Sequence, residues 1–163
     1  MMSGLRMVSL DDAEAICRIY NYYVANSTIS FEEEEVGVTE MTRRILDITN
    51  EYPWLVLERD GMVIGYAYAT KWKPRSAYRF SVECSVYLSN DAVGQGAGTL
   101  LYESLFEQLS TLGVHSVIGG IALPNSASVA LHEKLGFAKV AHFSEIGFKK
   151  DRWVDVGYWQ KAL

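Results

Sequence analysis

The sequence predicts a single domain of the mixed α/β class, in which one mixed sheet carries helices on its faces. The chain has 163 residues, of which 49% are hydrophobic and 21% are charged. This composition is typical of one folded domain and argues against a disordered or repetitive chain. Segments with helical periodicity also alternate along the chain with short β-branched and aromatic segments, and no internal repeat divides residues 1–163.

Two helices are expected in the N-terminal part. Ser9, Asp11 and Asp12 are residue types that cap helix N-termini, and an apolar stripe at helical spacing follows them. The stripe consists of Ile16, Ile19, Tyr20, Tyr23 and Val24. A second helix is expected from Thr39, with Met41, Ile45 and Ile48 facing inward.

A β-hairpin and another strand are expected next. The segments Trp54–Leu57 and Met62–Thr70 flank Asp60-Gly61, a dipeptide typical of the type I′ hairpin turn. After a basic loop, Phe80–Leu88 has the composition of a further strand.

The C-terminal part is expected to alternate helices and strands. A helix over Thr99–Leu112 places Leu101, Leu105, Leu109 and Leu112 on one face, and Gly113 ends it. The remaining segments are predicted as a strand over Val114–Leu123, a short helix over Ser126–Leu135 with Gly136 behind it, and strands from Phe137 and over Trp153–Trp159.

Charge and cysteine content exclude several classes of protein. The formal net charge is −5, which argues against nucleic-acid binding, because such proteins usually carry a basic face. Cys17 and Cys84 are too few for a disulfide framework and indicate reduced thiols in a cytoplasmic protein. Met1–Leu10 lacks the apolar core of a signal peptide, and the apolar run Val117–Leu123 is too short to span a bilayer. We therefore expect neither secretion nor a membrane partner.

A glycine-rich turn is the most informative motif. Gly94, Gly96 and Gly98 lie between a predicted strand and a predicted helix. Such a turn presents unpaired backbone amides and the positive end of the helix dipole, which suits phosphate oxygens. Glycine permits close backbone approach and positive φ angles. A plain tight turn with a glycine-rich helix start is the alternative interpretation.

Two common phosphate-binding motifs do not fit this turn. A P-loop needs Gly-Lys-Ser/Thr after four intervening residues, and no such lysine is present. A dinucleotide-binding loop needs a third glycine where Thr99 stands, and too little chain follows for that fold. A nicotinamide-dependent oxidoreductase is therefore disfavoured.

Several stretches together resemble the GNAT acetyltransferase superfamily and, within it, the phosphinothricin and methionine sulfoximine N-acetyltransferase branch. The resemblance covers nearly the whole chain and implies the GNAT fold, a central mixed twisted sheet with helices on both faces. The superfamily motifs are Gly94–Leu101 after the strand Glu83–Leu88, then Pro124–Ser128 and Leu131–Phe137. The branch motifs are Ile19–Val24, Ser27–Phe31, Tyr52–Val56, Gly65–Ala69, Val82–Leu88 and Trp153–Gln160.

The resemblance implies acetyl-CoA as the co-substrate, bound by the glycine turn and the strand before it. The cofactor-binding residues implied are Val86, Tyr87, Leu88, Val93, Gly94, Gln95, Gly96, Ala97, Gly98, Thr99, Asn125 and Ser128. One departure concerns Val93, which stands where the superfamily usually has Gln or Arg, so that one contact near the diphosphate is missing or displaced. The alternative role for Asn125 and Ser128 is helix capping, for which Ser126 is equally suited.

Glu83 is the candidate general base. Strand alternation puts Glu83, Ser85 and Tyr87 on one face, and the resemblance makes that the face where substrate binds. A carboxylate there can take the ammonium proton directly or through water. The alternative is a structural carboxylate paired with an arginine.

His132 is the second catalytic candidate. It stands where many GNAT enzymes carry a tyrosine that protonates the CoA sulfur, although a lone histidine beside a helix is more often structural. His115 and His142 share no metal-ligand spacing with it, so we expect no metal. Gly119-Gly120 inside a predicted strand indicates either close approach of a ligand or backbone, or a bulge.

We expect a small amino-acid-like substrate that is bound by the basic loop over residues 71–79. That loop lies beside the strand of Glu83, and its cations suit a carboxylate or phosphinate. The substrate-binding candidates are Phe31, Lys73, Arg75, Tyr78, Glu83 and Ser85, with Glu32 as a further residue that closes the pocket.

Two other functions remain open from the sequence: acetylation of a different amine, and an inactive CoA-binding protein, towards which Val93 points. The resemblance also implies a homodimer. Three aromatic residues near the C-terminus suit either the interface of such a dimer or the core: Trp153, Tyr158 and Trp159.

Overall fold

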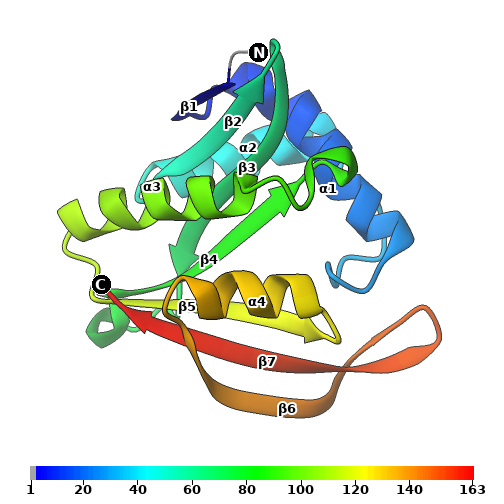
Figure 1. Ribbon diagram of the computed structural model, residues 1–163, viewed down its shortest axis with the longest axis vertical. Helices are drawn as coiled ribbons and strands as arrows, with labels where there is room; N and C mark the ends of the chain where they lie inside the picture. The colour runs from blue at the N-terminus through cyan, green and yellow to red at the C-terminus, as the bar shows by residue number, and fades with distance from the viewer. Residues whose placement is uncertain (1–2) are drawn as a thin grey trace.

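A computed structural model describes residues 3–163 (Figure 1). Its single seven-stranded sheet has the strand order β1-β2-β3-β4-β5-β7-β6. The strands are β1 (Ser3–Met7), β2 (Trp54–Arg59), β3 (Met62–Lys71), β4 (Ser81–Leu88), β5 (Ser116–Leu123), β6 (Ala138–Lys149) and β7 (Arg152–Ala162). Neighbouring strands are antiparallel except β4 and β5, which run parallel.

Four α-helices cover the two faces of this sheet (Figure 1). They are α1 (Ala13–Asn26), α2 (Val38–Thr49), α3 (Ala97–Thr111) and α4 (Ser126–Lys134). The helices α1 and α2 pack on one face and α3 and α4 on the other, each against its own buried apolar cluster. None of the helices between residues 3 and 163 has the length and apolar run needed to cross a bilayer.

The predicted fold class is therefore confirmed, with helices on both faces of one mixed sheet. The hairpin turn at Asp60-Gly61 has positive φ at both residues, as a type I′ turn requires. The predicted stripe of α1 is buried at Ile16, Ile19 and Val24 and only half-buried at Tyr23.

One strand was missed in the sequence analysis, and one side chain was misplaced. Strand β1 was not predicted, because its short sequence has little periodicity and its pairing partner, β2, lies about fifty residues away. Leu112 does not share the buried face of α3, since that helix ends at Thr111 and the Leu112 side chain is 58% exposed.

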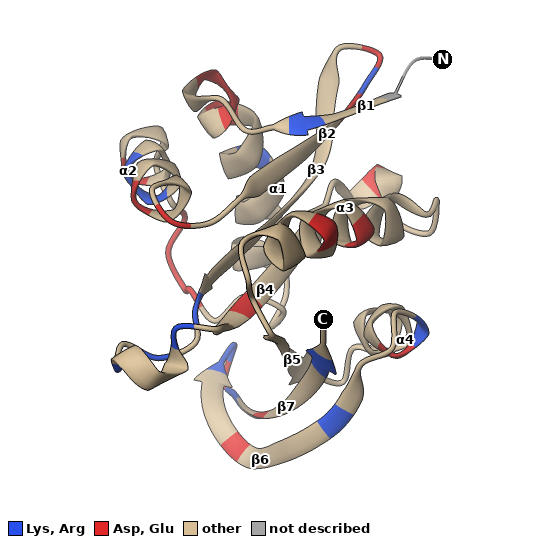
Figure 2. Cartoon of the chain, turned by 90° about the vertical axis from the view of Figure 1, so that its left-hand side faces the viewer, with Lys and Arg blue, Asp and Glu red and all other residues tan. Residues whose placement is uncertain are grey.

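Acidic and basic residues are distributed over many elements (Figure 2). The acidic stretch that follows α1 includes Glu33, Glu34 and Glu35, which are exposed. The basic loop after β3 contains the 3-10 turn Ser76–Tyr78 and leads into β4.

Candidate active site

The start of α3 forms an anion-binding turn. Gly94 and Gly96 have φ angles of +81° and +82°, which a residue with a side chain would adopt only with strain. The N-cap residue Gly96 offers no side chain to the first-turn amides, and the helical hydrogen bonds begin with Leu100 N–H donating to the Gly96 carbonyl. The helix leaves the preceding amides available to an anionic ligand.

A groove begins where β4 and β5 separate. These parallel strands pair only from Ser81 to Glu83 and from Ser116 to Ile118, although β4 continues to Leu88 and β5 to Leu123. The groove has a volume of about 480 Å³ and reaches the glycine turn. An unpaired strand edge on one side and helical amides on the other suit a long ligand with an amide-containing arm and a phosphate end.

Most residues predicted to bind the cofactor line this groove. They are Val86, Tyr87, Leu88, Val93, Gly94, Gly96, Gly98, Thr99, Asn125 and Ser128. Two others point elsewhere. Ala97 is buried in the core, and the Gln95 side chain bonds to Arg59 and to the Asp91 carbonyl. Gln95 therefore does not supply the contact that Val93 lacks.

Lys134 is a groove residue that the sequence analysis missed. It lies at the end of α4, lines the groove, and its Nζ is 3.4 Å from the Thr99 hydroxyl at the start of α3. Among the groove-lining residues of the described chain it is the one cation. Helix α4 packs closely against α3 at Gly98, where a Cβ would lie only 3.0 Å from the Leu131 side chain. This packing brings Lys134 to the groove.

Asn125, rather than Ser126, caps α4. The Asn125 side-chain oxygen accepts a hydrogen bond of 3.2 Å from the Ser128 amide, so the capping interpretation applies to this residue. Ser128 and Asn125 also line the groove, and the two roles coexist.

Glu83 lies beside an inner cavity of about 60 Å³ where the groove narrows between β4 and β5. The cavity is lined by Ser85 and Tyr87 of β4 and by Gly120 of β5. The Glu83 Oε2 atom is 3.2 Å from the point where a Cβ on Gly120 would stand. Burial raises the pKa of Glu83 above its ordinary value, and the nearby Lys73 ammonium partly opposes this.

His132 is 3% exposed and lines the same inner cavity. Its Nδ1 lies 2.7 Å from the Ser128 carbonyl and its Nε2 lies 3.2 Å from the Tyr102 hydroxyl. Burial lowers the pKa of His132. These contacts favour a neutral ring that carries its proton on Nδ1, assigned from the hydrogen-bond partners, and accepts a hydrogen bond at Nε2.

The two glycines of β5 make room for these side chains. The register of β5 with β7 is regular across Gly119 and Gly120, so no bulge occurs at this position. A Cβ on Gly119 would stand 2.6 Å from His132 Nε2, and one on Gly120 would stand 3.0 Å from Tyr158. The two glycines are therefore closely approached, as expected, and the approaching groups are side chains rather than backbone.

The basic loop contributes one residue close to Glu83. Lys73, which influences the Glu83 carboxylate, lies 5.0 Å from the centre of the Trp72 ring. Trp72 in turn contacts the Tyr158 ring edge-on, at 5.6 Å. Arg75 and Tyr78 are exposed and make no side-chain hydrogen bond within residues 3–163. Trp72 and Tyr158 were missed because only the pairing of β5 with β7 brings Tyr158 opposite Gly120.

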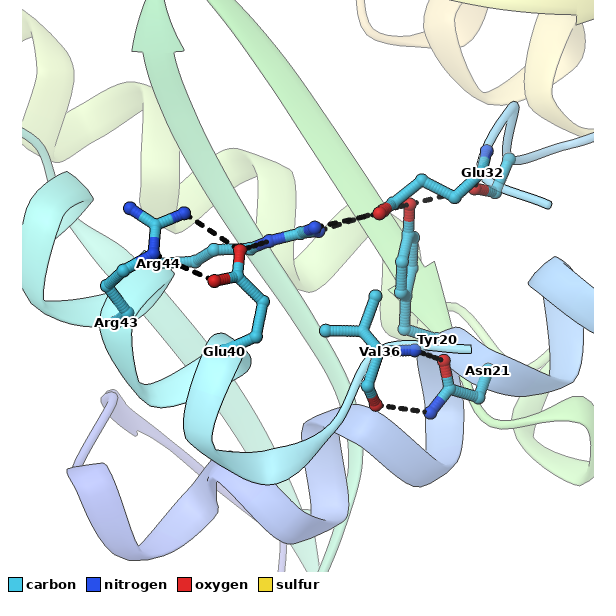
Figure 3. A network of polar contacts seen from close by, with 8 residues as sticks. Tyr20, Asn21, Glu32, Val36, Glu40, Arg43 and Arg44 are labelled. Carbon is cyan, nitrogen blue, oxygen red and sulfur yellow. Dashed lines mark hydrogen bonds and ion pairs between the residues drawn. The ribbon is translucent and has the colours of Figure 1, made fainter. Parts of the chain in front are cut away.

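Phe31 and Glu32, on the segment after α1, differ in what they contact. Phe31 packs against Gly147 of β6. The Glu32 carboxylate accepts hydrogen bonds of 2.7 and 2.8 Å from Arg44 and one from the Tyr20 hydroxyl (Figure 3). Glu32 therefore anchors its segment to α1 and α2 and does not face a substrate directly.

Within residues 3–163, no group of three or more His, Cys, Asp or Glu side chains is placed to hold a metal ion. The fold and the site thus suit a protein that binds a long, phosphate-bearing ligand along the free edge of β4. A titratable carboxylate, Glu83, lies beside Gly120, which lines the inner cavity.

Comparisons with known proteins name the class. Residues 5–157 match the family described as Acetyltransferase (GNAT) domain. The chain is 39% identical over 157 residues to a phosphinothricin N-acetyltransferase of Streptomyces viridochromogenes, covering 96% of this chain and 86% of that protein. It is 32% identical to an L-methionine sulfoximine/L-methionine sulfone acetyltransferase of Salmonella typhimurium, covering 98% and 94%.

A solved structure agrees with these relatives. A GNAT superfamily phosphinothricin acetyltransferase from Sinorhizobium meliloti, in complex with AcCoA, superimposes with a TM-score of 0.96 at 38% identity, covering 100% of this chain and 89% of that one. The chain therefore belongs to the GNAT acetyltransferase family, and it is an enzyme of the acyltransferase class.

Proposed function

We propose that the chain transfers the acetyl group of acetyl-CoA to the primary amine of a small glutamate-like amino acid, such as phosphinothricin or methionine sulfoximine. The observation that carries this proposal is the Glu83 carboxylate at the inner end of the groove, with a pKa raised by burial. The relatives named above support the substrate class. Acetylation of phosphinothricin would give resistance to that compound as a herbicide.

The groove fits acetyl-CoA. The glycine turn offers helical amides to the diphosphate, Lys134 adds a cation, and the unpaired edge of β4 over Val86–Leu88 can pair with the pantetheine amides. When bound, acetyl-CoA supplies a thioester carbonyl that an uncharged amine attacks.

Glu83 prepares the amine for this reaction. An amino acid arrives with its amine as an ammonium ion, which has no lone pair for the attack. The Glu83 carboxylate accepts one ammonium proton, directly or through a water molecule. Its raised pKa makes it a stronger base than an ordinary exposed glutamate, because the surrounding protein disfavours its charge.

His132 is the candidate group for returning a proton to the departing sulfur. His132 and Tyr102 both line the inner cavity, and the Tyr102 hydroxyl donates to the His132 ring. We propose that this pair gives one proton to the departing thiolate, and that the second proton lost by the attacking nitrogen as the amide forms restores the pair. Lys73, Arg75, Tyr78, Ser85 and Phe31 are the proposed contacts of the amino-acid substrate, with Lys73 and Ser85 supported by their positions beside Glu83 and in the inner cavity.

We also propose that the enzyme works in the cytoplasm as a homodimer. Cys17 and Cys84 are buried free thiols, which agrees with a reducing compartment. The exposed apolar side chains of β6 and β7 are the proposed dimer surface. They are Val140, Phe143, Ile146, Phe148 and Trp153.

A substrate panel tests the proposed function. Purified protein is incubated with acetyl-CoA and a set of amino acids, polyamines and aminoglycosides, and the free thiol released is measured. We expect thiol release with phosphinothricin or methionine sulfoximine and little with polyamines. Release with another amine only would change the substrate class, and tight acetyl-CoA binding without any release would favour an inactive CoA-binding protein.

A further inference from the structure

The segment over residues 27–32 connects α1 to the site. Ile29 lines both the groove and the inner cavity, and Phe31 follows two residues later. On its helix side, this segment is held by the hydrogen bonds from Tyr20 and Arg44 to Glu32 (Figure 3). Its other side faces the turn that joins β6 to β7, and both lie at the right in Figure 1.

A buried lysine joins that turn to the segment. Lys149, the last residue of β6, is 3% exposed, and its ammonium donates a hydrogen bond of 2.7 Å to the carbonyl of Ser30. Ser30 is itself buried, and its hydroxyl lies 2.8 Å from the Tyr20 hydroxyl. Burial of an ammonium group costs free energy unless the group is hydrogen-bonded or paired. Here its hydrogen bond holds the carbonyl of Ser30, between Ile29 and Phe31.

Neighbouring contacts reinforce this junction. A Cβ on Gly147 would stand 2.5 Å from the Phe31 ring, so the glycine lets the ring lie close against β6. Arg152 contacts the Thr28 hydroxyl at 3.4 Å. Lys150 is different, because it is exposed and donates to the Ala25 carbonyl within α1 rather than to the segment.

We propose that Lys149 is a positioning residue for the amino-acid end of the site. By holding the Ser30 carbonyl, it sets where two neighbours lie: Ile29, which lines the inner cavity, and Phe31, which packs on β6. It thereby controls how well the amine substrate binds. This inference rests on the proposed function. It predicts a selective effect on the amino-acid substrate, because within residues 3–163 Lys149 makes no hydrogen bond to the groove-lining residues at the glycine turn or on α4.

The test compares four variants with the wild-type enzyme. Lys149→Met keeps the aliphatic stem and removes the ammonium, and Lys149→Arg restores a buried donor. Gly147→Ala displaces Phe31 without altering charge. Lys150→Met is the matched control on the same turn. For each, KM and kcat for the amino-acid substrate, the Kd of acetyl-CoA by calorimetry, and amide hydrogen exchange of residues 27–32 are measured.

For Lys149→Met we expect about a tenfold rise in KM for the amino acid, with kcat and the acetyl-CoA Kd within about threefold, since one charge-assisted hydrogen bond is lost. Lys149→Arg should recover most of the KM, Gly147→Ala should raise it, and Lys150→Met should leave it unchanged. Exchange at residues 27–32 should increase in Lys149→Met but not in Lys150→Met.

An unchanged KM in Lys149→Met would overturn the inference. An equally large rise in the acetyl-CoA Kd would also overturn it, as would an equally large rise in the amino-acid KM in Lys150→Met. Either result would indicate that the residue only stabilises the fold. If Lys149→Met does not fold, Gly147→Ala decides by the same KM criterion. If the wild-type enzyme acetylates no amine, the proposed function fails, and hydrogen exchange alone then decides whether Lys149 orders the segment.

Discussion

At the scale of single residues, the chemistry of Glu83 depends on its surroundings. The carboxylate lies on β4, but the groups that shape its environment come from β5, β7 and the loop after β3. Gly120 leaves the space, Tyr158 fills one side of it, and Lys73 supplies the nearby positive charge. A glutamate in open water has none of these constraints, and so its pKa would be lower.

Replacing Glu83 should therefore separate binding from turnover. We expect Glu83→Gln to lower kcat/KM by about 10²–10⁴-fold, the usual contribution of a general base, and to leave the acetyl-CoA Kd unchanged. In the wild-type enzyme, activity should fall as pH drops through the raised pKa of Glu83, because the protonated carboxyl cannot accept a proton. The variant should lose this acid limb in a pH profile of kcat/KM, and unaltered turnover near neutral pH would remove Glu83 from the mechanism.

Lys134 gives a second prediction for a single residue, through its position in the groove beside Thr99. We expect Lys134→Met to weaken acetyl-CoA binding about fivefold, or ~1 kcal/mol, because an exposed cation contributes modestly to a phosphate contact. Calorimetry at low and high salt should show that the difference in acetyl-CoA Kd between Lys134→Met and wild type shrinks as salt screens the charge. Lys139→Met is the control, since Lys139 contacts His142 outside the groove, and equal losses in both variants would contradict a specific contact.

At the scale of elements, β1 is connected to the start of α1 by an ion pair. Arg6 donates two hydrogen bonds of 2.8 Å to Asp12, which also accepts one of 2.7 Å from the Ser9 amide. Asp12 is buried, and the Arg6 guanidinium holds the pKa of its carboxyl below the ordinary value. This junction fixes an edge strand that has little sequence signal of its own.

The ion pair should make the stability of the chain sensitive to acid. Because the folded-state pKa of Asp12 is lowered, its contribution is complete above the unfolded value of about 4 and is lost as pH falls through the folded value. We expect Asp12→Asn to lower the free energy of unfolding at pH 7 by about 1–2 kcal/mol, and the difference from wild type to be smaller at pH 3, below the unfolded value. Urea titrations at both pH values measure this, with exposed Asp11→Asn as the control; a constant difference would exclude the linkage.

At the scale of the whole molecule, the exposed apolar side chains gather on the C-terminal strands. Trp153 is 61% exposed and packs on Phe148 with ring centres 4.9 Å apart, whereas Trp159 on the same strand is buried in the core. Trp159 therefore takes the core role that the sequence allowed, and Trp153 remains available for the proposed interface. An exposed aromatic pair of this kind is typical of an interface between protein chains.

The proposed homodimer should therefore depend on this surface. We expect wild-type protein to sediment as a dimer and Trp153→Glu to sediment as a monomer, because a buried unpaired carboxylate at an interface is strongly unfavourable. Met62→Glu is the matched control, since Met62 is 59% exposed on the β2–β3 hairpin. A wild-type monomer, or a Trp153→Glu dimer as tight as wild type, would contradict the proposed surface.

By itself, the sequence determined the elements that depend on local interactions, and the family resemblance added their assembly. The period of α1, the Asp60-Gly61 turn and the glycine start of α3 were predictable because each depends on residues a few positions apart. Only the tertiary structure decided where β1 pairs, that β4 and β5 part after Glu83, and that Lys134, Tyr158 and Lys149 lie where they do. Those features come from contacts between residues separated by tens of positions, and local sequence patterns carry no information about such pairings.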